Sequence, residues 1–128
     1  MKKFLCLISL IFIVSNGLHA QRNWKLLGIK RVDDRLERDA ILVGRSRGDF
    51  KALLIKVKGA SVDFRKVKVV FGNGQEQEVE LRNTIPSGGS SRVIDLQGGD
   101  RVIREIIFWY DANTLRGKKA IVRVFART

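Results

Sequence analysis

Short apolar stretches with alternating polar residues recur along the chain from residue 24 to residue 127. In the stretch ending at Val57, the apolar residues Leu53, Ile55 and Val57 share one parity, and the lysines beside them share the other. A period of two is typical of a half-buried strand, because successive side chains point to opposite faces. No window has the amphipathic period of a helix. The pattern predicts an all-β fold, a single-domain antiparallel β-sandwich of about eight short strands, jelly-roll or Greek-key like.

Turn residues divide the chain into these strands. The longest predicted loop, 83–91, holds the only proline and a Gly-Gly-Ser-Ser run. Residues 106–110 are all apolar, which indicates a central strand covered on both faces. The predicted strands are 24–32, 40–43, 50–57, 62–71, 75–82, 92–96, 101–111 and 119–127.

The stretch 62–71 changes phase partway along. Val62 and Phe64 share one parity, whereas the apolar residues from Val67 onward share the other. A β-bulge adds one residue to a strand and shifts its phase. We therefore expect a bulge near Arg65 and Lys66.

A Gly-Asn-Gly sequence at 72–74 follows and predicts a hairpin. A two-residue turn would mix polar and apolar faces, whereas a three-residue loop ending at a left-handed Gly74 keeps them apart. The polar face of this hairpin would carry Lys-Glu pairs across the strands. The predicted opposite pairs are Val67 with Val79, Lys68 with Glu78, and Lys66 with Glu80.

Residues 1–20 have the layout of a secretory signal peptide. Lys2 and Lys3 precede an apolar run at 4–14, and Ala20 supplies a small residue for cleavage. The run is shorter than the ~20 residues that span a bilayer. We therefore expect an exported protein, periplasmic or secreted, whose domain is 21–128, without a transmembrane segment in the mature chain.

Cleavage there would also remove the only cysteine and the only histidine, Cys6 and His19. Without them the mature chain has no thiol nucleophile, no Ser-His-Asp triad and no His or Cys metal site. We therefore predict that the protein is not an enzyme and has no catalytic residues, metal or cofactor. Chemistry that uses carboxylates alone stays open.

One acidic cluster is a candidate for such chemistry. It comprises Asp33, Asp34, Glu37 and Asp39, and arginines lie between and beside these residues. Calcium needs six to eight converging oxygens, and this spacing does not match an EF-hand. Surface ion pairs are favoured over a catalytic dyad or a calcium loop.

Removing Lys2 and Lys3 would lower the formal net charge from +12 to +10. A field of that sign favours polyanionic partners, but it also serves solubility, and both interpretations stay open. The basic residues form one patch only if the fold brings them together. The candidate anion-binding residues are Arg45, Arg47, Lys56, Lys58, Arg116, Lys118, Lys119, Arg123 and Arg127.

Three aromatic side chains are candidates for stacking on a ligand. Trp109 lies within the most apolar strand, so a core position is favoured for it. Trp24 and Tyr110 are retained as candidate aromatic contacts.

Several segments resemble the YaaI-like family of small exported bacterial proteins of unknown function. They are Lys-Leu-Leu-Gly at 25–28, Gly-Ala-Ser-Val-Asp-Phe at 59–64, Ile-Pro at 85–86, Ile-Asp-Leu at 94–96, Arg-Val-Ile at 101–103 and Ile-Ile-Phe at 106–108. The resemblance implies a periplasmic or secreted β domain, and it supplies no catalytic residues.

Together these features predict a non-catalytic binding or structural module at the cell envelope. Its basic surface suits anionic polymers or lipid headgroups, and no specific nucleic acid is expected as a partner. The alternative is a carbohydrate-binding or carbohydrate-processing domain that uses Trp24, Tyr110 and carboxylates. The oligomeric state stays open.

Overall fold

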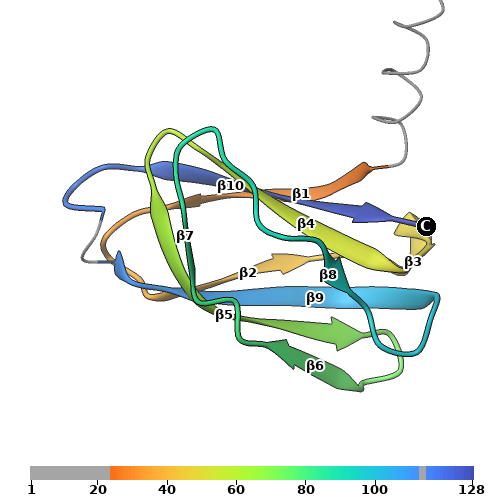
Figure 1. The fold of residues 1–128 in the computed structure, drawn as a ribbon. Helices are drawn as coiled ribbons and strands as arrows, with labels where there is room; N and C mark the ends of the chain where they lie inside the picture. Colours follow the sequence, from red (N-terminus) through yellow and green to blue (C-terminus); the bar gives the residue numbers. More distant parts are fainter. Residues whose placement is uncertain (1–23, 113–114) are drawn as a thin grey trace, which may run out of the picture.

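The computed structural model describes residues 24–112 and 115–128. Within these residues the chain forms ten strands in two antiparallel sheets that lie one above the other (Figure 1). The helical structure described is confined to 3-10 turns, including η1 (Arg45–Arg47). The predicted β-sandwich is confirmed, and the expected signal segment lies outside the described residues.

Sheet A has four strands in the order β1-β10-β4-β8. Strands β1, β4 and β10 come from the beginning, the middle and the end of the described chain, so sheet A is assembled from distant segments. The bounds are β1 (Lys25–Val32), β10 (Ala120–Arg127), β4 (Ala52–Lys58) and β8 (Ile94–Asp95).

Sheet B contains six strands, four of them in the order β2-β9-β5-β6. Two short strands complete it, since β3 pairs with β9 and β7 pairs with β5. The bounds are β2 (Arg38–Leu42), β3 (Asp49–Phe50), β5 (Val62–Phe71), β6 (Glu76–Val79), β7 (Asn83–Ile85) and β9 (Arg101–Tyr110).

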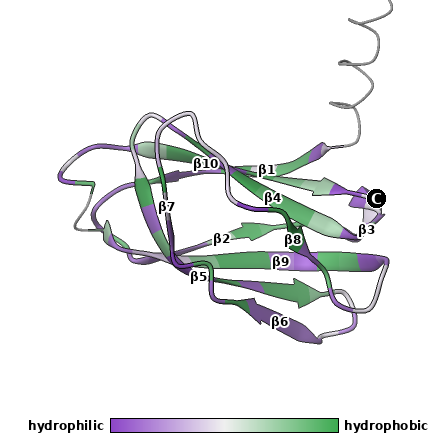
Figure 2. Cartoon of the chain, in the orientation of Figure 1, coloured by the Kyte–Doolittle hydropathy of each residue, from purple (hydrophilic) through white to green (hydrophobic). Residues whose placement is uncertain are grey.

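The core lies between the sheets and follows from the period of two. In β10, Ala120, Val122, Val124 and Ala126 are fully buried, and each residue between them is half-exposed. Figure 2 shows the same division between strands, with β6 hydrophilic along most of its length and the strands over the core largely apolar. One face of each sheet is therefore available to solvent.

Three aromatic rings fill the part of the core beneath sheet B. The ring centroids of Phe64 and Phe108 are 5.8 Å apart in an edge-to-face arrangement, and those of Phe108 and Tyr110 are 6.0 Å apart. All three residues are at most 1% exposed. Such rings bury large apolar areas and prefer these offset geometries, so this cluster anchors β5 and β9 to the core.

The predicted hairpin register is confirmed. Val67 pairs with Val79 and Lys68 pairs with Glu78. The loop is the three residues 72–74, closed by a hydrogen bond from Phe71 N to Gln75 O of 2.8 Å. Gly74 has φ +89°, a left-handed conformation that favours glycine. The apolar pattern alone was sufficient to select this loop length.

The predicted bulge is also confirmed. The register of β5 against β9 shifts between Phe64, which pairs with Tyr110, and Lys66, which pairs with Trp109. Arg65 is therefore the extra residue, and the apolar residues on both sides of it point into the core.

The prediction of eight strands was too low for the described residues. Predicted strand 50–57 is divided between β3 and β4, and predicted strand 92–96 is reduced to β8. Residues 83–91, predicted as a loop, begin with β7, where Ile85 pairs with Val62 and is fully buried. A three-residue strand has too little sequence to show a period, and Pro86, which has no backbone N–H, follows it directly.

Gly28 lies where β1 passes close to sheet B. The register of β1 against β10 shifts just before this residue. A Cβ atom here would collide with Cγ2 of Ile41 in β2. The close approach of the two sheets at this corner therefore requires glycine.

A buried amide joins the sheets at another edge. Gln77 in β6 is 7% exposed. Its Nε2 donates to Asp95 O at 3.0 Å, and its Oε1 accepts from Gln97 N at 2.9 Å. Both ends of the amide are thus satisfied by the β8 segment, as a buried polar group requires.

Candidate anion-binding face

The two sheets carry very different charges. The strands of sheet A contain seven basic residues and one acidic residue, whereas the strands of sheet B contain six of each. The acidic residue of sheet A, Asp95, lies on its edge strand β8. All thirteen Asp and Glu of the chain lie between residues 33 and 111, within the described part. The fold therefore separates a cationic sheet from a balanced one.

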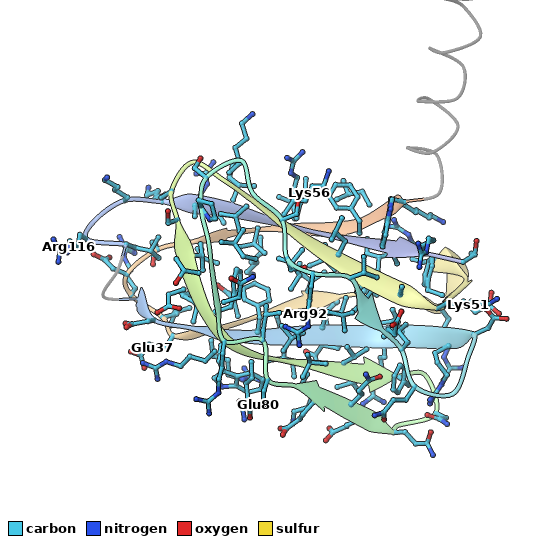
Figure 3. All side chains as sticks on the ribbon, in the orientation of Figure 1. Glu37, Lys51, Lys56, Glu80, Arg92 and Arg116 are labelled. Carbon is cyan, nitrogen blue, oxygen red and sulfur yellow. The ribbon has the colours of Figure 1, made fainter. Side chains whose placement is uncertain are left out.

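The strand registers place five of the seven basic residues of sheet A on its outer side. Arg123 in β10 lies opposite Lys56 in β4 and Ile29 in β1, and residues opposite one another share a face. Figure 3 shows Lys56 projecting from the side of sheet A that faces away from sheet B. We call this surface the cationic face; its residues are Leu26, Ile29 and Arg31 of β1, Leu54, Lys56 and Lys58 of β4, and Ile121, Arg123, Phe125 and Arg127 of β10.

An aromatic ring lies among the cations at the centre of this face. Lys56 Nζ is 5.4 Å from the centroid of the Phe125 ring, and the Arg123 guanidinium carbon is 5.9 Å from it. At the end of β10, Arg127 approaches the Trp24 ring at 5.0 Å. These cation-π contacts hold the basic groups against apolar surface, with their stems partly buried.

Arg123 is distinctive in this group. Its Nε is buried and has no hydrogen-bond partner among the described residues. The guanidinium carries five N–H donors in a fixed plane that suits carboxylate and phosphate oxygens. Arg123 is partly exposed in the middle of the cationic face, so an external anion would meet its terminal N–H groups and not the buried Nε.

The basic residues of the cationic face form no ion pairs within the described residues. On sheet B the situation is reversed, since Lys66 lies 3.6 Å from Glu78 and Lys68 lies 3.6 Å from Glu76. These Lys-Glu pairs are diagonal across the predicted hairpin. Their carboxylates neutralise the sheet B lysines, whereas the cations of the cationic face have no ion-pair partner among the described residues.

The cationic face also exposes apolar side chains. Ile29 is 57% exposed and Leu26 is 37% exposed, although both are large aliphatic residues. Leu54, Ile121 and Phe125 are partly exposed beside them. The surface therefore combines positive charge with accessible hydrocarbon.

The predicted anion-binding residues divide into three groups along the sandwich. Lys56, Lys58, Arg123 and Arg127 lie on the cationic face. Arg31, which also lies there, was missed because it stands beside the acidic cluster at 33–39 and was predicted to be one of its ion-pair partners.

A second group, Arg45 and Arg47, lies in η1. Arg47 donates from its guanidinium to Leu26 O, and its own carbonyl accepts from Lys25 Nζ at 3.0 Å. Arg47 is therefore partly engaged in holding η1 against β1, while Arg45 is exposed.

The third group, Arg116, Lys118 and Lys119, lies in the exposed loop before β10. Figure 3 shows Arg116 at one end of the molecule and Lys51 at the other. Gly117 N in this loop donates to Asp34 Oδ2 at 2.7 Å. The structure thus gathers four of the predicted residues and places the other five near the ends of the sandwich.

The predictions for the aromatic residues of β9 were wrong. Tyr110 is 1% exposed and packs in the core, so its ring is not available to a ligand. Trp109, for which a core position was favoured, is partly exposed on the outer side of sheet B. Five consecutive apolar residues carry no polar residue that would set the phase. Trp109 has the same parity as the charged residue Glu105, and this was the available signal that Trp109 faces outward.

Burial raises the pKa of Tyr110 to about 12, and the nearby carboxylates of Asp39 and Asp33 add to the shift. The phenol is therefore neutral at physiological pH. Asp39 also lies 3.5 Å from Lys30 Nζ. These contacts have a structural role beneath β2, on the inner side of sheet B.

One ion pair of the acidic cluster joins it to a neighbouring arginine. Asp33 accepts from Arg35 N at 3.0 Å and lies 3.9 Å from Arg35 Nε. No group of His, Cys, Asp or Glu suited to holding a metal ion is found among the described residues. Nor do those residues include a helix long and apolar enough to cross a membrane.

A family model, domain of unknown function (DUF2541), matches residues 5–126. The chain therefore belongs to this family, whose function is not defined. A search of curated proteins gives no match.

Solved structures share the fold. AlgX of Pseudomonas aeruginosa is similar with a TM-score of 0.51 and 16% identity, over 81% of this chain and 27% of that one. The chain thus spans about a quarter of AlgX. A mutant of CBM29-2, a family 29 carbohydrate binding module, gives a TM-score of 0.43 at 16% identity, over 83% of this chain and 76% of the module. CpGH89CBM32-6 of Clostridium perfringens gives 0.44 at 14% identity, over 80% and 75%. At this identity the likeness to AlgX shows a shared fold only.

Proposed function

We propose that this protein is an exported, non-catalytic binding module that attaches to an anionic lipid surface of the cell envelope through the cationic face. The observation that carries the proposal is the separation of charge between the sheets, which leaves Arg31, Lys56, Lys58, Arg123 and Arg127 without ion-pair partners in the described residues. The resemblance to the YaaI-like family and the export signal at residues 1–20 stay predictions that agree with it.

The charge supplies attraction over distance. Each Lys or Arg close to an anionic membrane surface contributes roughly 1 kcal/mol, which falls off within a Debye length. Five such groups on one face give a strongly salt-dependent attraction. The phosphate oxygens of lipid headgroups suit the planar guanidinium of Arg123, a partly exposed residue at the centre of the face.

The apolar residues favour a lipid surface over a soluble polymer. Ile29 and Leu26 project from the same face as the cations. Hydrocarbon inserted at the headgroup boundary adds to binding, whereas a hydrated polyanion gains little from it. Because the cations also lie on three adjacent strands, they form a two-dimensional array rather than a single line.

The test measures sedimentation of the exported protein with vesicles of phosphatidylglycerol and of phosphatidylcholine. We expect binding to the anionic vesicles alone, and a steep loss as NaCl rises from about 50 mM to about 300 mM. The double variant Lys56→Glu with Arg123→Glu is expected to bind at least about tenfold more weakly.

A matched control makes the same change in net charge on the other sheet. Arg65 and Arg104 are exposed residues of sheet B strands, so Arg65→Glu with Arg104→Glu alters the field but not the cationic face. We expect this control to retain most of the vesicle affinity. Equal losses in the two double variants would show that net charge alone drives binding and would refute the assignment to this face.

A heparin column separates lipid from polymer. Ile29→Ser is expected to weaken vesicle binding and to leave elution from heparin unchanged, because only the membrane interface accepts hydrocarbon. Retention on heparin without vesicle binding would overturn the lipid assignment. Failure to bind either material at low salt would overturn the proposal as a whole.

A further inference from the structure

The outer side of sheet B has its own centre at Trp109. Cations from both neighbouring strands approach the indole ring, with Lys66 Nζ 4.5 Å from the ring centroid and the Arg38 guanidinium carbon 5.6 Å from it. Lys68 Nζ is 5.9 Å away. The ring therefore has a fixed place on the surface, held by β5 on one side and β2 on the other.

Trp109 separates two hollows. The first has a volume of about 600 Å³ and is lined by charged residues of β5 and of the segment joining β6 to β7, including Asp63, Glu80 and Arg82. The second has a volume of about 760 Å³ and lies over β2, where Ala40 and Leu42 line it with Glu37 and Glu105. Because the indole lines both, the hollows form a track that crosses the strands of sheet B.

The charges of this track balance. The first hollow has two carboxylates and three basic groups. The second has three carboxylates and two basic groups, of which Asp39 and Lys30 pair with each other at the edge of the sandwich. Figure 3 shows Glu37 and Glu80 on the sheet B side of the molecule, away from Lys56. A polyanion gains no net attraction here, whereas a ligand with many hydroxyl groups finds both donors and acceptors.

The apolar part of the track is also suited to such a ligand. Leu42 is 78% exposed and Leu36 is 56% exposed, and both line the second hollow with Trp109. A sugar ring has apolar C–H faces and a polar edge, so it packs on aromatic and aliphatic surface while its hydroxyls reach charged side chains.

An ion pair lies at the rim of the first hollow. Arg82 Nε donates to Glu80 Oε2 at 2.9 Å, and the two side chains are 81% and 65% exposed. Arg82 has φ +39°, a left-handed conformation that residues with a Cβ adopt only at a cost. The pair thus presents a donor and an acceptor together at the edge of the hollow.

We infer that the outer side of sheet B binds a neutral oligosaccharide, which lies across the strands with one sugar ring against Trp109. This site is independent of the cationic face and of the proposed membrane attachment. The ring contacts the indole, and the hydroxyls of the flanking sugars exchange hydrogen bonds with charged residues of both hollows.

Tryptophan fluorescence tests this inference directly. The chain has two tryptophans, so the variant Trp24→Phe leaves Trp109 as the single reporter. The probes are cellohexaose, xylohexaose, mannohexaose and maltohexaose. We expect at least one of them to shift the emission of Trp109, with an affinity that changes less than about twofold between low and high salt.

Two variants then locate the site by calorimetry. Trp109→Ala is expected to weaken binding of the active probe by about tenfold or more, as loss of a stacking partner does. Arg82→Ala, at an exposed side chain that the fold does not need, is expected to weaken it severalfold. Trp24→Ala, at the opposite sheet, and Lys56→Glu with Arg123→Glu are matched controls that should bind normally.

The inference is overturned if none of the four probes perturbs Trp109 at millimolar concentration. It is also overturned if Arg82→Ala and Trp109→Ala bind as the unchanged protein does, or if a mixed-charge peptide competes for the track while the sugars do not. None of these outcomes bears on vesicle binding, so the two proposals fail separately.

Discussion

The outer faces of the two sheets cover the same core but differ in how their basic residues are paired. On sheet A, Lys56 and Arg123 lie over the Phe125 ring with no carboxylate in reach. On sheet B, Lys66 lies over the Trp109 ring and also 3.6 Å from Glu78. The same motif of a cation on an aromatic ring is thus left open to anions on one face and neutralised on the other. The carboxylates around a basic residue therefore determine whether its charge is left unpaired.

The largest expected effect comes from removing the support that both faces share. Phe108→Ala deletes a fully buried ring and should lower the free energy of unfolding by about 3–5 kcal/mol. Phe125→Ala removes a partly exposed ring from the cationic face, so it should cost about 1 kcal/mol and weaken vesicle binding. Urea unfolding measures both. Equal costs for the two variants would contradict the assignment of inner and outer faces.

The inner side of β9 makes stability sensitive to high pH through Tyr110. Tyr110 keeps its phenolic proton to a pKa of about 12 in the folded state. The unfolded chain releases it near the ordinary pKa of about 10, so it binds fewer protons in this window. Stability should therefore be unaffected by this group below about pH 10 and fall between about pH 10 and pH 12.

Tyr110→Phe is the control for that loss. Lysines titrate in the same window in both proteins, so the difference between the two pH profiles isolates the phenol. Tyr110 is the single tyrosine, and its phenolate absorbance reports the titration directly. An absorbance transition near the ordinary pKa would show that the hydroxyl is accessible and that β9 is wrongly phased.

A carboxylate added to the cationic face makes the two faces alike. Ile29→Glu places an acid opposite Arg123 at a position that is 57% exposed, so little apolar burial is lost. We expect stabilisation of about 0.5 kcal/mol at low salt, which disappears at high salt, together with weaker vesicle binding. Thermal unfolding at two salt concentrations measures the first effect. Ile29→Gln is the uncharged control and should not stabilise.

The smallest effect concerns the paired lysines. Glu76→Gln with Glu78→Gln removes two exposed ion pairs from sheet B and should cost a few tenths of a kcal/mol for each pair. Lys56→Gln with Lys58→Gln removes unpaired charges from sheet A and should be neutral or slightly stabilising. Chemical denaturation at low salt compares them. Destabilisation by the second pair of substitutions would reveal ion pairs on the cationic face.

The features that sequence predicted correctly are local. The three-residue hairpin loop and the bulge at Arg65 follow from the parity of residues that lie within about ten positions of one another, because each side chain must face either core or solvent. The membership of the binding surfaces was harder to predict. Arg31 was missed because it stands beside acidic residues in the sequence. Trp109 and Tyr110 were assigned to each other's environments because a wholly apolar run gives no phase.

The sequence by itself determined the strands, most of their faces and the excess of basic residues. Alternation of apolar and polar side chains is a property of neighbours in the chain, and it survives without knowledge of the fold. Which charged residues lie close together depends on the tertiary structure. Strand order β1-β10-β4 brings together three segments that are poor in acids, while β5 and β6 bring glutamates to the lysines of sheet B. Attraction between charges acts through space, so only the arrangement of distant strands determines which cations stay available to an anion.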